Sequence, residues 1–153
     1  MLPKWHIILG FIFTVICFWL FPEIGFVGFL IIFLSSFLID TDHYLFHVFT
    51  KKDLSLKNAH QWFIEDHNKF QKLNRKERKV YLKKLLPRPM IFHGIEAILI
   101  LIILSFISPL FSYILIGFLF HEFLDLIYII YGNYTLTHIG SQTYNIMLYF
   151  KKK

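Results

Sequence analysis

The stretch Gly117-Phe-Leu-Phe-His121-Glu122-Phe-Leu-Asp125 lies inside an apolar run from Pro109 to Tyr131. A run of this length can cross a bilayer as a helix, which needs about 20 mostly apolar residues. A carboxylate near the bilayer centre costs about 2.5–3.5 kcal/mol on insertion scales, so such groups usually face the interior of a helix bundle and mark function. His121 and Asp125 are spaced i, i+4, which places both side chains on one face of the helix.

Composition extends this interpretation to the whole chain. Of the 153 residues, 56% are hydrophobic and 20% are aromatic, and the apolar residues fall in blocks. A soluble protein cannot cover that much apolar surface, so the sequence predicts an all-α, polytopic membrane protein forming a single domain over residues 1–153. The single cysteine, Cys17, lies in an apolar run, which excludes an intrachain disulfide and a cysteine metal cluster.

The net charge of +6 is distributed unevenly. One basic residue precedes the first apolar run, twelve fall between Lys51 and Arg88, and three end the chain. The short connections between the apolar blocks hold none. With four spans, every basic residue falls on one side, so we expect both termini and the central loop to be cytoplasmic. This pattern predicts a multi-pass protein of the cell (inner) membrane and argues against a nucleic-acid partner.

The apolar blocks place the four spans at about residues 5–21, 24–39, 90–107 and 109–131. The interior polar groups of the first span are taken to be Thr14 and Cys17, which suggests a lipid-facing scaffold helix. Ser35 and Ser36, in the second span, are small enough to allow close helix approach. The tail over 132–153 is expected at the membrane interface and includes a short amphipathic piece.

The central loop, residues 48–89, is predicted to hold two helices. One runs from Lys57 to Leu73, and a basic one follows from Arg75 to Leu86. The intervening Asn74-x-x-Glu77 resembles a capping box. The basic helix is expected either to lie on anionic lipid headgroups or to form a solvated hairpin. The sequence leaves open whether any of four other histidines joins a site: His47, His60, His67 and His138.

Chemistry-bearing side chains recur at one level of the predicted membrane. Asp40-Thr-Asp42-His43 leaves the second span at its cytoplasmic end, and a continuing helix would turn Asp42 away from Asp40. His93 and Glu96 begin the third span at i, i+3. His121 and Asp125 lie in the cytoplasmic half of the fourth. With about 1.5 Å of rise per residue, these segments differ in depth by only a few turns.

Mixed histidine and carboxylate ligands suit zinc, or manganese or iron where carboxylates dominate. A divalent cation would also neutralise the buried acids. Glu96 and Glu122 are the candidate general bases for metal-bound water. Two alternatives stay open, namely interhelical hydrogen bonds without a metal, and a proton or ion pathway. The candidate metal ligands are Asp40, Asp42, His43, His93, His121 and Asp125.

The ordered set Asp40-x-Asp42-His43, Phe92-His93 and Gly117-x-x-x-His121-x-x-x-Asp125 resembles the YdjM-like predicted membrane-bound metal-dependent hydrolases. The resemblance covers about residues 24–47 and 90–130. It implies an integral-membrane hydrolase whose shared histidine and aspartate residues bind metal. The chain departs from the family pattern His-Arg-Gly-x-Thr-His-Ser, because Arg88 stands for the first histidine and Gly94 for the serine.

These observations predict a membrane-embedded metal-dependent hydrolase whose site opens at the cytoplasmic leaflet. The depth of the site and the basic loop beside it suggest a phosphoester of a lipid or lipid-linked compound as substrate. The alternatives are a membrane protein that transports or binds metal ions, and a non-catalytic scaffold. The lipid bilayer is the expected partner, and a homodimer is compatible with so small a bundle.

Overall fold

The computed structural model of the chain describes residues 3–84, 88, 90–132 and 140–152, and these residues form helices and turns without a strand. The predicted all-α class is therefore confirmed. The elements in chain order are α1 (Pro3–Leu20), the 3-10 turn η1 (Pro22–Ile24), α2 (Gly25–Leu38), α3 (Thr41–Lys51), α4 (Leu56–Gln71), α5 (Arg75–Lys84), α6 (Ile95–Ser105), α7 (Pro109–Gly132) and α8 (Gln142–Lys152).

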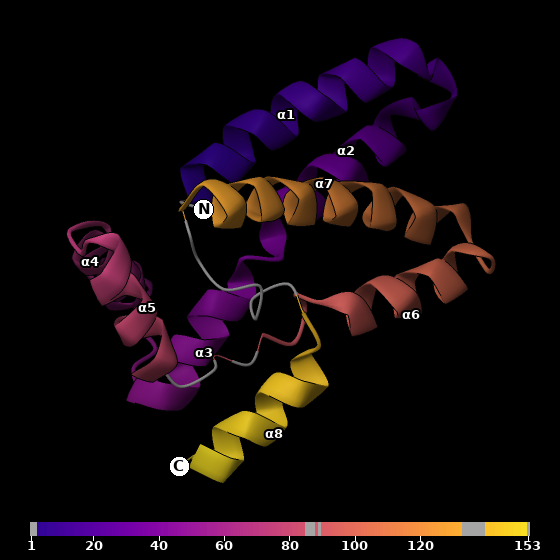
Figure 1. Ribbon diagram of the computed structural model, residues 1–153. Coiled ribbons are helices and arrows are strands. Elements are labelled where there is room, and N and C mark those ends of the chain that lie inside the picture. The colour runs from indigo at the N-terminus through magenta and orange to yellow at the C-terminus, as the bar shows by residue number, and fades with distance from the viewer. Residues whose placement is uncertain (1–2, 85–87, 89, 133–139, 153) are drawn as a thin grey trace.

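Three helical stretches are long and apolar enough to cross a membrane: Pro3–Leu20, Pro22–Lys51 and Pro109–Gly132. In Figure 1, α2 packs between α1 and α7, α6 follows the other side of α7, and both helix-joining turns lie at the right edge. The helices α4 and α5 lie at the opposite edge. Large hydrophobic side chains on α1 and α6 are exposed, as a lipid-facing surface requires.

Small residues bring α1, α2 and α7 close together. A Cβ atom at Gly117 would collide with the Ile32 carbonyl oxygen and the Ser35 hydroxyl, and one at Gly10 would collide with the Ser36 hydroxyl. Tight backbone approach through glycine and serine is the usual way for helices to associate in lipid, where burial of apolar surface gives no driving force. The predicted role of Ser35 and Ser36 is consistent with these contacts.

The predicted third span is shorter than expected. Gly94 has φ +115°, which L side chains rarely adopt, and α6 begins only at Ile95. Its 11 residues rise about 16 Å, about half of a hydrocarbon core of about 30 Å. The four-span count therefore stays a prediction, and the three stretches above carry the membrane assignment.

The central loop contains the two predicted helices. Helix α4 begins after Ser55, whose hydroxyl accepts the Asn58 N–H, and ends at Gln71. The capping box before α5 is confirmed, because the Asn74 side chain accepts the Glu77 N–H and the Glu77 carboxylate accepts the Asn74 N–H. The predicted end of this helix near Leu86 lies outside the described residues.

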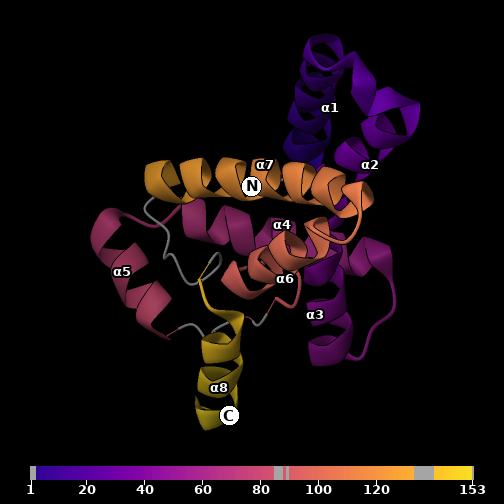
Figure 2. The same cartoon turned by 90° about the vertical axis from the view of Figure 1, so that its right-hand side faces the viewer.

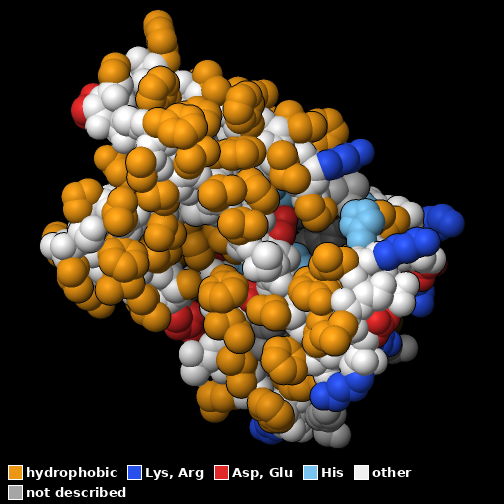
Figure 3. Space-filling view, turned by 180° about the vertical axis from the view of Figure 1, so that it is seen from behind, with side chains coloured by type: hydrophobic (Ala, Val, Ile, Leu, Met, Phe, Trp, Pro, Cys, Tyr) orange, Lys and Arg blue, Asp and Glu red, His pale blue; other side chains and the backbone are white. Residues whose placement is uncertain are grey.

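Polar and apolar side chains separate on the surface. Figure 3 shows a broad hydrophobic face, with Lys and Arg side chains gathered along the edge away from the α1–α2 turn. Figure 2 shows α3, α4, α5 and α8 together on one side of α7, with α1 and α2 rising on the other. The predicted amphipathic tail piece is α8, which leaves Tyr144, Met147 and Phe150 exposed.

Candidate metal centre

A break between α2 and α3 turns two acids toward the interior. Helix α2 ends at Leu38, Ile39 and Asp40 form a turn, and α3 starts at Thr41. The Asp40 side chain is 10% exposed and that of Asp42 is 2% exposed. An unbroken helix would have pointed these two carboxylates apart, so the turn places both of them in the site.

Asp42 holds the segment that leads into α6. One of its carboxylate oxygens, Oδ2, accepts the backbone N–H groups of Phe92 and His93. The same oxygen lies 3.3 Å from Nδ1 of the His93 ring. A carboxylate behind a histidine is the usual partner that fixes the tautomer and direction of a metal-binding imidazole. The structure therefore places Asp42 behind His93, where it orients that ring.

His121 comes from the middle of α7 and is oriented in the same way. Its Nδ1 lies 2.9 Å from the Ser36 carbonyl oxygen of α2. Because a carbonyl and a carboxylate only accept hydrogen bonds, we assign the N–H of both neutral rings to Nδ1. The Nε2 atoms of His93 and His121 then carry lone pairs, and they lie 3.2 Å apart. Two facing lone pairs repel unless a cation or a proton lies between them.

Asp40 completes a triangle of donor atoms. Its Oδ1 lies 3.7 Å from Nε2 of His121 and 3.9 Å from Nε2 of His93. With the 3.2 Å between the two nitrogens, the point equidistant from all three atoms in their plane is about 2.1 Å from each. Divalent metals such as zinc bind nitrogen and oxygen ligands at about 2.0–2.2 Å, so the spacing of the three donor atoms suits a divalent metal ion.

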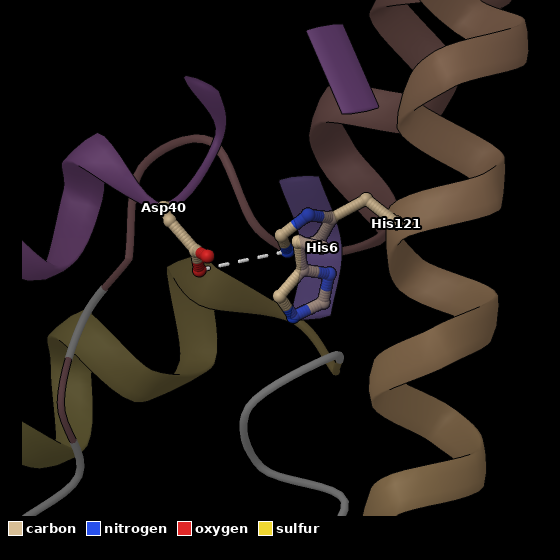
Figure 4. A group of neighbouring side chains, drawn as sticks. All are labelled: His6, Asp40 and His121. Carbon is tan, nitrogen blue, oxygen red and sulfur yellow. Dashed lines mark ion pairs between the residues drawn. The ribbon is translucent and has the colours of Figure 1, made fainter. Parts of the chain in front are cut away.

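His6 joins the centre from α1, which corrects the prediction that Thr14 and Cys17 were the interior polar groups of the first span. The His6 side chain is fully buried, and its ring stacks on His121 with centroids 4.0 Å apart. Figure 4 shows this stack beside Asp40. The sequence signal for it is the spacing of His6, Gly10 and Thr14 at i, i+4, i+8, which places these polar and small residues on one helix face. The structure buries all three.

Asp125 links His6 to the rest of the centre. Its Oδ2 lies 3.7 Å from Nε2 of His121, and its Oδ1 lies 3.2 Å from Nε2 of His6. The contact with His6 has the length of a hydrogen bond but not its alignment. The predicted i, i+4 pairing of His121 and Asp125 on one helix face is confirmed.

His43 forms the outer edge of the cluster. Its Nε2 lies 3.5 Å from Oδ1 of Asp40, and its side chain is 25% exposed, whereas the His93 and His121 side chains are fully buried. Three overlapping groups of donor atoms, each within 4.8 Å of one another, describe the whole centre: His6, Asp40 and His121; Asp40, His43 and His93; and His93, His121 and Asp125.

The two predicted general bases, Glu96 and Glu122, do not belong to the three donor groups of the described residues. The Glu96 carboxylate accepts the Ser141 hydroxyl at 2.6 Å and the N–H groups of Gln142 and Thr143, so it caps the start of α8. His93 and Glu96 do not share a helix face, because α6 begins after His93. Glu122 is buried on α7 but belongs to none of the three donor groups.

His47, His60 and His67 do not enter the three donor groups of the described residues. His47 is buried beside Asp53, with 3.6 Å between its Nε2 and the carboxylate. His60 is exposed, and Nδ1 of His67 lies 3.2 Å from the Tyr128 hydroxyl. His138 lies outside the described residues.

Comparison with known proteins gives no match: no family model, no curated protein and no solved structure matches this chain. The resemblance to membrane-bound hydrolases therefore stays a prediction. What the centre can do is inferred from its own donor atoms. Buried histidine and aspartate groups from α1, α2–α3, the segment before α6 and α7 converge on one place, and such a set can hold a divalent metal ion.

Proposed function

We propose that this chain is a membrane-embedded metal-dependent hydrolase whose site opens at the cytoplasmic leaflet. The observation that carries the proposal is the pair of oriented imidazoles, His93 and His121, whose Nε2 atoms face each other at 3.2 Å with Asp40 beside both. Lone pairs and carboxylates gathered in a buried place favour a cation, because the cation removes both the repulsion and the cost of burying charge.

His93, His121 and Asp40 are proposed to hold the ion, with the Ser36 carbonyl and Asp42 fixing the two rings. A donor set rich in imidazole nitrogen favours zinc over manganese. A zinc ion held there would supply Lewis-acid chemistry and would lower the pKa of a bound water toward neutrality.

The proton of the attacking water is proposed to pass to His6. Neither ring nitrogen of His6 has a hydrogen-bond partner in the described part of the chain, and Asp125 lies against its Nε2. A carboxylate on one ring nitrogen supports uptake of a proton at the other, as in other histidine general bases. This assignment replaces Glu96, whose carboxylate is engaged at the start of α8.

The proposed substrate is a phosphoester of a lipid or lipid-linked compound. Exposed hydrophobic side chains surround the helices that carry the centre, so an amphiphile can approach from the bilayer. In the proposed topology α6 is a short third span, and both termini and the basic helices α4 and α5 face the cytoplasm, in accord with the distribution of Lys and Arg.

Metal transport, the alternative function, needs polar groups beyond the centre. On the outer side, the buried residues Ile32 of α2 and Phe118 of α7 are apolar, and the buried Thr14 hydroxyl donates to the Gly10 carbonyl of its own helix. This close packing favours a site that opens on one side only.

Elemental analysis of detergent-purified protein tests the proposal. The wild type is compared with His93→Ala, His121→Ala and Asp40→Ala, with His60→Ala as the control because His60 is exposed on α4. We expect about one zinc per chain in the wild type and the control, and loss of the metal in the three variants. A wild type without metal after chelator-free purification contradicts the metal centre.

Hydrolysis is tested separately on metal-loaded protein. Short-chain phosphatidic acid is supplied in detergent, and phosphate release is followed before and after treatment with a chelator. We expect release that stops on chelation and returns when zinc is restored. Metal-loaded protein that releases no phosphate from any lipid phosphate overturns the substrate class but leaves the metal centre intact.

A further inference from the structure

The metal centre is accessible along one edge. The side chains of His6, His93 and His121 are fully buried and that of Asp125 is 2% exposed, whereas His43 is 25% exposed. Figure 3 shows acidic and histidine side chains in a hollow between hydrophobic ones, with basic side chains at its edge. His43 is the most exposed histidine of the cluster, so a ligand that contacts the cluster from outside meets His43 and the groups next to it.

Aromatic rings of α4 stand next to His43. The ring of Phe63 meets that of His43 edge to face, with centroids 4.8 Å apart. Trp62 lies beside Phe63, with 4.8 Å between ring centroids. Two cations lie over this aromatic pair: the Arg88 guanidinium carbon is 5.3 Å from the Trp62 centroid and 5.8 Å from that of Phe63, and Lys51 Nζ is 5.4 Å from Trp62.

Arg88 is held in place by Asp66. Its Nη2 donates to Oδ2 of Asp66 at 2.7 Å, while the other carboxylate oxygen accepts the Tyr81 hydroxyl at 2.7 Å. Burial, together with this bond to Asp66, raises the pKa of Tyr81 to about 12, so the hydroxyl stays a donor at neutral pH. An arginine fixed by stacking and by a carboxylate loses little side-chain entropy when it binds a ligand.

The guanidinium keeps donors for a ligand. Arginine has five N–H donors. Within the described residues, the Arg88 guanidinium donates a hydrogen bond only to Asp66, so other N–H groups can bind a ligand. The side chain is 23% exposed. From the two ring contacts through Phe63, the Arg88 guanidinium carbon lies at most about 11 Å from the His43 ring centroid. This bound is compatible with one headgroup that extends from His43 to Arg88.

We propose that Arg88 binds a phosphate group of the substrate at the entrance to the metal centre, with Phe63 and Trp62 as the wall against which the guanidinium is held. A planar guanidinium matches phosphate oxygens with two parallel N–H bonds. The proposal rests on the proposed hydrolase function and narrows its substrate to amphiphiles whose headgroup carries a phosphate. Arg88 is a specificity-determining residue in this scheme and takes no part in bond breaking.

The test is a binding titration that uses Trp62 as its reporter. Trp5→Phe and Trp19→Phe leave Trp62 as the single tryptophan of the three in the chain. Its fluorescence is followed as dihexanoyl phosphatidic acid, inorganic phosphate or dihexanoyl glycerol is added to protein with zinc and to protein treated with a chelator. Three further changes are made in this background: Arg88→Gln, Asp66→Asn, and Arg75→Gln as an exposed control arginine.

We expect phosphatidic acid to bind and dihexanoyl glycerol not to bind. Arg88→Gln should lower the affinity for phosphatidic acid at least about tenfold, because charge-assisted hydrogen bonds are lost. Arg75→Gln should leave this affinity unchanged. Asp66→Asn should raise the affinity for phosphatidic acid, because it removes a negative charge that competes with the phosphate for Arg88 and keeps an acceptor for the guanidinium. If Arg88 only supported the fold, Asp66→Asn would weaken binding as Arg88→Gln does, and this result overturns the proposal.

The remaining outcomes separate the source of the phosphate and the role of the metal. Inorganic phosphate that binds as tightly as phosphatidic acid overturns the lipid assignment. Equal binding of dihexanoyl glycerol overturns phosphate recognition. The chelator-treated protein tests phosphate binding by Arg88 separately from the metal centre. If Arg88→Gln lowers the affinity there, Arg88 binds the phosphate even if the protein holds no metal, so the two proposals can fail independently.

Discussion

The close approach of α2 and α7 gives a prediction that connects helix packing to metal binding. Gly117 lies one turn before His121 on α7, and a Cβ atom there would overlap the Ile32 carbonyl oxygen of α2. For that contact to reach van der Waals distance, the two helices must part by about 1 Å. The bond between His121 Nδ1 and the Ser36 carbonyl, now 2.9 Å, would lengthen by a similar amount and break.

Gly117→Ala is therefore expected to destabilise the fold by about 1–3 kcal/mol, the usual cost of overpacking. It is also expected to weaken zinc binding about 10- to 100-fold, the usual cost of losing the partner that orients a ligand. Thermal unfolding in detergent measures the first effect, and competition with a zinc indicator measures the second.

Gly28→Ala is the matched control for this experiment. A Cβ atom at Gly28 meets side chains, those of Ile24 and Tyr113, and Gly28 lies two turns before Ser36 on the same helix. We expect it to lower stability without lowering the zinc affinity. If Gly117→Ala binds zinc as tightly as the wild type, the Ser36 carbonyl does not orient His121 for a metal and the reasoning fails.

Three further predictions concern other parts of the chain. Asp42→Asn removes the negative charge behind His93, so zinc affinity in the competition assay should fall about 10- to 100-fold; unchanged affinity would refute this role. His6→Ala should keep its zinc by elemental analysis but lose about 10²–10⁴-fold in hydrolysis rate, and loss of zinc instead would identify His6 as a ligand. Hydrogen bonds from Asn58 and Ser55 lower the pKa of Asp53, so its stabilisation of the α3–α4 turn is present above the ordinary pKa of about 3.9 and is lost as the pH falls through the lowered value. The protection factors of the amides at the start of α4, that is, their exchange relative to the intrinsic rate at the same pH, should therefore fall in acid, and Asp53→Asn should remove that pH dependence of the protection.

Much of the site could be predicted because burying a histidine or a carboxylate in an apolar helix costs free energy, so such a residue indicates a function. Asp40, His93, His121 and Asp125 stand out in hydrophobic surroundings, and helix periodicity places the last two together. Periodicity could not place Asp42, because its direction depends on the turn at Ile39 and Asp40 that ends α2. A local break of this kind depends on tertiary contacts, here the two backbone N–H groups that Asp42 accepts.

Two errors share a physical origin. The sequence does not predict His6 as a site residue, because it stands near the end of its span, where a polar side chain can reach the interface. The i, i+3 spacing predicts that Glu96 lies beside His93, but Gly94 has a positive φ and α6 begins only after it, so the two side chains have different neighbours. In both cases the sequence fixes the residue type, and only the packing of α1 or α8 decides which partner it meets.

The depth of the centre explains why a cation is favoured over interhelical hydrogen bonds. In the proposed topology, Asp40 lies 15 residues after the start of α2 and His121 lies 12 after the start of α7, about 18–22 Å from the outer helix ends. In a hydrocarbon core of about 30 Å this is about 8–12 Å inside its cytoplasmic edge. Each carboxylate there costs about 2.5–3.5 kcal/mol, whereas an interhelical hydrogen bond returns about 0.6–2 kcal/mol. Asp40, Asp42 and Asp125 lie together at this depth, and the proposed divalent cation, held by Asp40 and the two oriented imidazoles, would add positive charge that hydrogen bonds from neutral histidines do not supply.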